Sequence, residues 1–257
     1  MSSLGAAQWP GAPGTPGTPG RTGRMGRARW LGRVAYDDAL ALQRQVHADR
    51  VEGLAPDTLL LLEHDSTYTA GRASDAAHFL ISPHELMRAG HAVRETTRGG
   101  DVTWHGPGQL VAYPIVDLSD GRLGMRRDIH AYLRCLEDVL IGTCAEFGVD
   151  AWRENGRTGA WTRGGKIGAI GIRVARWVTH HGIALNVNPA LSHFDAIVPC
   201  GLQGAAVTSI EVELARAGRD ELPTLAEVAR TQAAMFARVF ETTWMDGLEV
   251  VRAESIA

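Results

Sequence analysis

The sequence predicts an α+β fold in which mixed β-sheets pack against helices. Two observations support this prediction. Short strand-like segments follow one another without an intervening helix between residues 91 and 116, and again between residues 166 and 187. The helix-like segments instead lie near the beginning, the middle and the end of the chain, whereas a doubly wound parallel sheet would place a helix after almost every strand.

The first elements are expected to be a strand, a helix and a buried strand. A strand near Arg29–Val34 precedes a helix over Tyr36–Val51, which Asp37 or Asp38 can cap. The apolar run Leu59–Glu63 has the length of a buried strand.

The middle of the chain is expected to hold a short helix, three strands and a longer helix. Ser82-Pro83 puts serine at a helix cap and proline in the first turn, so a helix should run to Met87. Apolar residues recur at helical spacing over Asp128–Phe147. The strands between the two helices are short and surround Gly-rich turns: His91–Glu95, Val102–Trp104 and Gln109–Val116.

The last third of the chain should contain a strand pair and a long helix. Lys166–Val174 and Val178–Val187 are close enough in sequence to pair as antiparallel neighbours. Thr224 and Glu227 form a capping box that starts a helix running to about Thr243. No internal repeat is visible, so residues 28–257 are expected to form a single domain.

Residues 1–27 are rich in Gly, Pro and Thr and are expected to be a disordered extension, with Met25 as an alternative start. The N-terminus has no apolar central region typical of a signal peptide, and no apolar run is long enough to span a membrane. The three cysteines lack metal-site or disulfide spacing, which indicates a reducing compartment. A cytoplasmic protein is expected.

The charge is distributed unevenly along the chain. Residues 1–33 contain five arginines and no acid, so the rest of the chain has 21 basic and 29 acidic residues and a net charge of −8. An acidic body argues against binding to nucleic acid. Between Arg122 and Arg176 there are ten basic and six acidic residues, which suits an acidic partner. A solvated face with no partner is the more common explanation of such a segment.

Lysine occurs once in this chain, as Lys166, beside 25 arginines. A side chain that arginine has not replaced is a candidate for losing a proton near neutral pH, which guanidinium cannot do. Lys166 follows two glycines at the start of an apolar strand, where desolvation favours the neutral amine. Chance survival of one lysine, or a lysine whose amine reaches solvent from the strand end, is the alternative.

Cys200 is the candidate nucleophile. It lies between Pro199 and Gly201, in a loop where a thiol can meet a substrate and carry an acyl group. Cys135 and Cys144 lie in the 128–147 helix and are expected to be packing residues.

Four glycines and a proline lie between Arg98 and Gln109, so the backbone there can approach a ligand closely. The segment lacks the spacing of a phosphate-binding loop and of a dinucleotide fold. His105 is expected to be structural from the sequence alone. His180 and His181 are adjacent in a strand, so they should point to opposite faces and cannot jointly bind a metal.

Three segments together resemble the bacterial lipoyl(octanoyl) transferases. They are Arg98-Gly-Gly-Asp-Val-Thr-Trp-His-Gly-Pro-Gly-Gln-Leu110, Gly165-Lys-Ile-Gly-Ala-Ile-Gly171, and His181-Gly-Ile-Ala-Leu-Asn-Val-Asn188 with Pro199-Cys200-Gly201. The resemblance extends over about residues 30–245, in the order and at the spacing of that family.

The resemblance implies the fold of biotin and lipoate protein ligases, with Cys200 as nucleophile and Lys166 as its base. It implies octanoyl transfer from acyl carrier protein to a lysine of lipoyl domains, in 2-oxoacid dehydrogenase E2 subunits and the glycine cleavage H protein, by a monomer without metal or cofactor. It also implies these substrate-binding residues: Arg98, Gly99, Gly100, Asp101, Val102, Thr103, Trp104, His105, Ala169, Ile170, Gly171, Gly182, Ile183 and Ala184.

The expected chemistry needs no ATP, because transfer from a thioester to an amine is downhill. Gly168 and Gly171 are expected to leave room for the alkyl chain. Two alternatives remain: an ATP-dependent lipoate- or biotin-type ligase, which has no need for the Pro-Cys-Gly segment, and a non-catalytic module that binds lipoyl domains or the carrier protein.

Overall fold

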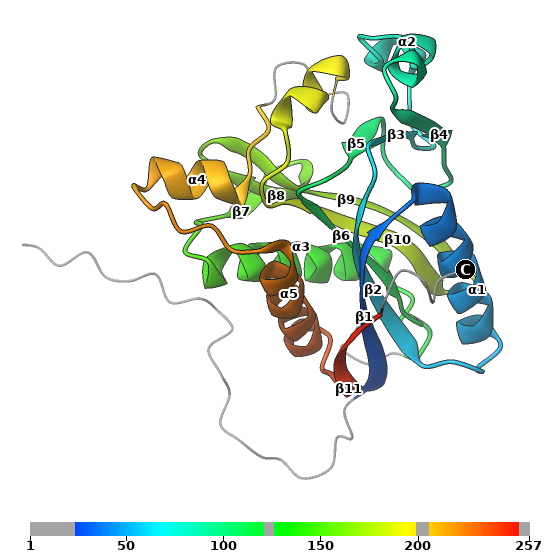
Figure 1. The fold of residues 1–257 in the computed structure, drawn as a ribbon. Coiled ribbons are helices and arrows are strands. Elements are labelled where there is room, and N and C mark those ends of the chain that lie inside the picture. The colour runs from blue at the N-terminus through cyan, green and yellow to red at the C-terminus, as the bar shows by residue number, and fades with distance from the viewer. Residues whose placement is uncertain (1–23, 121–125, 199–205, 252–257) are drawn as a thin grey trace, which may run out of the picture.

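Two β-sheets form the centre of the molecule in the computed structural model, which describes residues 24–120, 126–198 and 206–251. The larger sheet has eight strands, and a three-stranded sheet lies beside it (Figure 1). In spatial order the large sheet contains β11 (Thr242–Val250), β1 (Arg24–Val34), β2 (Asp57–His64), β6 (Gln109–Ile115), β10 (Val178–Asn186), β9 (Gly165–Ala175), β8 (Arg157–Thr162) and β7 (Trp152–Glu154).

The large sheet is mixed, because β1 pairs in parallel with both β2 and β11 while the strands from β2 to β7 pair antiparallel. The small sheet has the order β4 (Ala92–Glu95), β3 (Thr67–Ala70) and β5 (Thr103–His105). Parallel and antiparallel pairs, together with helices grouped on the two faces, confirm the α+β prediction.

The helices cover both faces of the large sheet (Figure 1). Leu60 and Leu62 of β2 point towards α1 (Tyr36–Val51), whereas Leu59 and Leu61 point towards α3 (Ile129–Glu146) and α5 (Leu225–Val239). All four leucines are fully buried, and their alternation is the two-residue period of a strand. Among the described residues there are two shorter helices, α2 (Pro83–Arg88) and α4 (Ile210–Arg216).

Several sequence predictions are confirmed. Helix α1 has the predicted bounds, and capping boxes start α2 at Ser82 and α5 at Thr224. The predicted strand pair appears as β9 and β10, which are antiparallel.

Other predictions were wrong in detail. Neither aspartate caps α1: its N-cap is Ala35, and Asp37 instead pairs with Arg94 at 2.7 Å. Helix α5 ends at Val239, before the predicted end near Thr243, because β11 begins at Thr242. Strand β1 begins at Arg24, so residues 24–27 belong to the sheet and not to the N-terminal extension.

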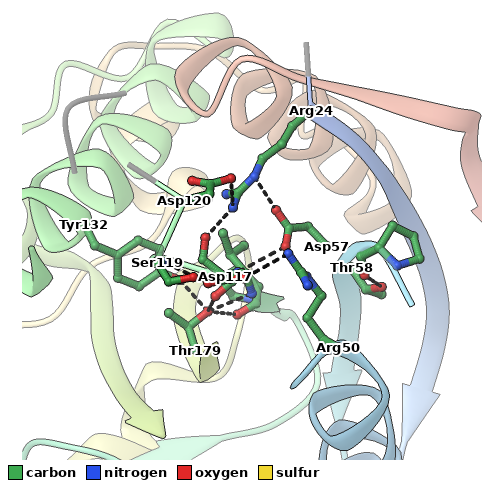
Figure 2. A network of polar contacts seen from close by, with 12 residues as sticks. Arg24, Arg50, Asp57, Thr58, Asp117, Ser119, Asp120, Tyr132 and Thr179 are labelled. Carbon is green, nitrogen blue, oxygen red and sulfur yellow. Dashed lines mark hydrogen bonds and ion pairs between the residues drawn. The ribbon is translucent and has the colours of Figure 1, made fainter. Parts of the chain in front are cut away.

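Arg24 is held in the sheet by buried charges, which we call the Arg24 network (Figure 2). Its guanidinium lies 2.8 Å from Asp57 and 2.8 Å from Asp120. Arg50 at the end of α1 also contacts Asp57, at 2.8 Å, and reaches Asp117 at 3.3 Å. The network joins β1, β2, α1 and the segment after β6, and both Arg24 and Asp57 are almost fully buried.

Candidate active site

The backbone of Lys166 is fixed between β8, where Trp161 is its partner, and the 206–208 segment. The Lys166 amide donates to the carbonyl of Ala206 at 2.8 Å, and the Thr208 amide donates to the carbonyl of Lys166 at 3.0 Å. Gly165 has a φ of +130°, and a Cβ there would lie 2.2 Å from the Ala206 oxygen. Only glycine fits this position, so Gly165 allows the 206–208 segment to pair with Lys166.

The Lys166 side chain is buried and lies beside an aromatic ring. Its Nζ is 5.5 Å from the centre of the Trp161 ring, close enough for a cation–π contact. Gly159 lies against the side chain, since a Cβ at that position would approach Lys166 Cε to 3.0 Å. The lysine is therefore a positioned group and does not extend freely into solvent.

Lys166 lines a cavity of about 540 Å³, which we call the Lys166 cavity. Its wall comes from β9, the β7–β8 turn, α3 and the loop before β5. The other lining residues are Ala73, His78, Gly99, Gly100, Asp101, Leu133, Gly156, Arg157, Thr158, Ile170, Gly171 and Ile172.

A second, smaller cavity adjoins the first, and we call it the inner cavity. The two share Gly100, Asp101, Ile170 and Gly171 in their walls, so these four residues lie between the two cavities. The inner cavity lies between β6, β9 and β10. Its remaining lining residues are Tyr36, Arg98, Val102, Thr103, His105, Val111, Tyr113, Ala169, His181, Gly182, Ile183 and Ala184.

The turn Arg98-Gly99-Gly100 forms the wall between the cavities because it is held on two sides. Arg98 is buried, and its Nη2 donates to the Thr69 carbonyl at 2.6 Å and to the Thr69 hydroxyl at 2.8 Å. On the other side the Gly99 amide donates to the carbonyl of Ile172 in β9 at 2.7 Å. Gly71 lies close against this turn, where a Cβ would be 2.2 Å from the Gly100 oxygen.

Buried histidines surround the inner cavity and are neutral near pH 7. Burial, with smaller contributions from His64 and Arg98, lowers the pKa of His105 to about 3. Burial likewise lowers the pKa of His64 to about 4 and that of His181 to about 3. His64 donates through Nδ1 to the Val34 carbonyl at 2.9 Å, so its Nε2 accepts from the Tyr113 hydroxyl at 2.7 Å.

Most of the predicted substrate-binding residues line one or both cavities. Trp104 does not: it is buried on the other side of β5, stacks on His193 with ring centres 4.5 Å apart and donates to the Ser66 hydroxyl. Strand alternation explains this, because Thr103 and His105 on either side of Trp104 face the inner cavity. The other residues that line the cavities were not predicted as site residues: Tyr36, Ala73, His78, Val111, Tyr113, Leu133, Gly156, Arg157, Thr158, Ile172 and His181.

The prediction that His180 and His181 point to opposite faces was wrong. Their rings stack with centres 4.8 Å apart. His181 has a φ of +57°, and its amide donates to the Gln43 side chain at 3.0 Å. The alternation of β10 is interrupted here, which turns the His181 ring towards its neighbour.

The predicted role of Gly168 in leaving room for an alkyl chain was wrong. A Cβ at Gly168 would lie 3.0 Å from the Leu140 side chain of α3, so this glycine makes room for the core. Gly171 lines both cavities, although a Cβ there would lie 3.1 Å from Arg98, and its role towards an alkyl chain stays a prediction.

Two of the three cysteines are packing residues, as predicted. Cys144 is fully buried in the core, and burial raises the pKa of its thiol to about 12. Cys135 packs against the same core, and burial raises its pKa to about 11. Neither thiol is ionised near pH 7, so neither is a ready nucleophile.

Cys200 lies outside the described residues, as do Pro199 and Gly201. The chain on both sides of this segment is hydrogen-bonded through its backbone to two residues that line the Lys166 cavity. The Val198 amide donates to the carbonyl of His78 at 2.8 Å, and the Ala206 carbonyl accepts from Lys166. Among residues 24–120, 126–198 and 206–251, no three His, Cys, Asp or Glu side chains are grouped to hold a metal, and no helix could cross a bilayer.

Residues 35–237 match the family model described as the lipoyl protein ligase A/B catalytic domain. The octanoyltransferase of Geobacter metallireducens is 49% identical over 208 residues, covering 81% of this chain and 90% of the relative. The octanoyltransferase of Solibacter usitatus is 45% identical over 225 residues, which cover 88% of this chain and 97% of that relative.

Solved structures show a similar fold at low sequence identity. A lipoate-protein ligase A bound with ATP has a TM-score of 0.65 at 14% identity, with 90% of this chain and 92% of that one covered. The putative lipoate protein ligase Ta0514 of T. acidophilum with bound lipoic acid has the same TM-score, identity and coverage.

Proposed function

This chain belongs to the lipoyl protein ligase A/B catalytic domain family and is an acyltransferase of the octanoyltransferase type, and we propose that it moves an octanoyl group from acyl carrier protein to a lipoyl-domain lysine through a thioester on Cys200. The donor, the acceptor and the covalent intermediate are the proposed parts of this reaction. The transfer would be the first step of endogenous protein lipoylation.

The observation that carries the proposal is the position of Lys166 in the wall of the larger of two neighbouring cavities. The inner cavity, lined largely by apolar groups and neutral rings, suits the alkyl chain. The Lys166 cavity is larger and suits the thioester and the incoming amine. The chain before and after Cys200 touches its wall, which supports a nucleophile at this place.

The proposed reaction has two halves. Lys166 takes the proton of the Cys200 thiol, the thiolate attacks the carrier thioester, and the carrier thiol leaves with the proton returned from Lys166. The acceptor lysine then attacks the acyl-enzyme as a neutral amine, the Cys200 thiolate leaves, and Lys166 accepts a proton. Cys135 and Cys144 are poor alternatives because their pKa values are raised by burial.

The proposed acceptors are the lipoyl domains of 2-oxoacid dehydrogenase E2 subunits and the glycine cleavage H protein. For the acidic donor we propose docking on the basic excess between Arg122 and Arg176. Within that stretch Arg153 and Arg176 form ion pairs with acidic residues, whereas Arg157 lines the Lys166 cavity. We propose a cytoplasmic monomer; the absence of disulfide-type cysteine spacing supports the compartment.

The proposal predicts transfer without nucleotide. Purified protein should acylate an apo lipoyl domain from octanoyl-acyl carrier protein when ATP is absent, because the thioester already supplies the activation. The product is measured by the mass of the lipoyl domain, and free octanoate with ATP is the parallel reaction. A strict requirement for ATP, with free octanoate as donor, would assign the chain to the ligases.

A further inference from the structure

We propose that His78, positioned by Asp101, is a second proton acceptor in the Lys166 cavity and serves the transfer of the acyl group to the acceptor amine. This inference rests on the proposed function and names a group that the Cys200–Lys166 chemistry leaves out.

The geometry joins the two residues. His78 ends the 3-10 turn η1 (Ala76–His78), and its Nδ1 lies 2.6 Å from Asp101 Oδ2. The other carboxylate oxygen of Asp101 accepts from the Val102 amide at 2.7 Å, which fixes the carboxylate. Both side chains line the cavity that contains Lys166. The carboxylate therefore lies against the imidazole and restricts the positions that the ring can take.

A proton count shows why a second acceptor is needed. An acceptor lysine enters as an ammonium near pH 7, with three N–H bonds, and leaves as an amide with one. Two protons must therefore depart as the C–N bond forms and the C–S bond breaks. The Cys200–Lys166 pair gave one proton to the carrier thiol in the first half-reaction, so it takes back only one. His78 takes the other.

The surroundings of His78 allow it to pass that proton on. Its side chain is 29% exposed, so the imidazolium can release the proton to water and return to the neutral form. In the first half-reaction, in which the carrier thioester acylates Cys200, there is no second proton to remove. The thiol proton moves from Cys200 through Lys166 to the sulfur of the leaving carrier thiol. Other charged groups near His78 are Arg157 and Lys166 in the cavity and Asp75 at the start of η1.

The test separates the two half-reactions in single-turnover measurements. His78→Gln should form the acyl-enzyme at the wild-type rate but transfer the acyl group about 10²-fold more slowly at pH 7, a low value for general acid–base catalysis. The deficit should shrink as the pH rises towards the pKa of a lysine amine, near 10, because the acceptor then arrives with one proton fewer. Asp101→Asn should slow acyl transfer more than it slows formation of the acyl-enzyme, with a deficit in transfer that shrinks in the same way as the pH rises, and it carries the test if the histidine variant fails to fold.

His84→Gln is the matched control, because it removes an exposed histidine of α2 that lies in neither cavity. The inference is overturned if both half-reactions slow equally, if the deficit is independent of pH, or if His78→Gln transfers at the wild-type rate. A wild-type protein that never forms an acyl adduct would overturn the proposed function and this inference together.

Discussion

Lys166 differs from the 25 arginines of the chain in its surroundings as well as in its chemistry. Its backbone is locked between β8 and the 206–208 segment, and its side chain lies between Trp161 and Gly159. A group held in this way can serve as a base only if it can lose its proton, which lysine can do and arginine cannot.

Replacing Lys166 by arginine therefore separates charge from proton transfer. We expect Lys166→Arg to lower turnover by about 10²–10⁴, the usual contribution of general acid–base catalysis. Acylation of the cysteine should suffer less than transfer to the acceptor, because a nearby cation still lowers the thiol pKa. Rapid-quench measurements of each half-reaction would show this. Near-normal rates in both would leave Lys166 with only an electrostatic role.

The buried histidines predict how stability depends on pH. Burial lowers the folded pKa of His64 to about 4, so the folded chain stays neutral at pH values where the unfolded chain binds a proton. The contribution of His64 to the free energy of unfolding is then fully present above about pH 6.5, and it is lost as the pH drops towards 4. One such histidine can change the free energy of unfolding by at most about 1.4 kcal/mol for each pH unit in this range.

Urea titrations between pH 7 and 4.5 would measure this slope. His64→Gln should cost stability at pH 7, through its bonds to Val34 and Tyr113, but should flatten the slope. His84→Gln, an exposed position, should leave the slope unchanged. If His64→Gln leaves the slope unchanged, the folded and unfolded chains bind a proton at His64 over the same pH range, and the expectation is wrong.

At the scale of elements, the predictions succeeded where local chemistry is strong. Serine at the cap with proline in the first turn located the helix at Ser82, a capping box located the helix at Thr224, and four leucines located β2. Strand β11 was missed because its side chains are mostly exposed and show no apolar alternation; its pairing with β1 is a long-range contact. The predicted disorder to residue 27 failed at Arg24, because its partners Asp57 and Asp120 are far away in the sequence.

Two truncations test the start of β1. Deleting residues 1–23 should change the free energy of unfolding by less than about 0.5 kcal/mol, as expected for residues unable to bury apolar surface. Deleting residues 1–27 also removes Arg24 and should cost up to about 3–5 kcal/mol, because it removes a partner from a buried ion pair. Arg24→Ala in the full chain should reproduce much of this loss. Equal stability of the two truncations would show that the Arg24 network contributes nothing.

At the scale of the whole molecule, the fold brings together groups that the sequence keeps far apart. The motif residues from Arg98 to His105 and from Ala169 to Gly171 could be selected from the sequence, because they form contiguous segments. Tyr36 and Tyr113 could not, since they come from α1 and β6 and meet the motifs only across the sheet. His78 was missed because a single histidine in a loop carries no periodic signal.

The covalent intermediate is the central claim, and the mass of the intact protein tests it most directly. After mixing with octanoyl-acyl carrier protein without nucleotide or acceptor, wild-type protein should gain one octanoyl group. Cys135→Ala and Cys144→Ala should gain it too, at some cost in stability, whereas Cys200→Ala should gain none. Adding an apo lipoyl domain should then remove the adduct from the wild type. An adduct that survives Cys200→Ala, or transfer to the lipoyl domain by Cys200→Ala at the wild-type rate, would contradict the account.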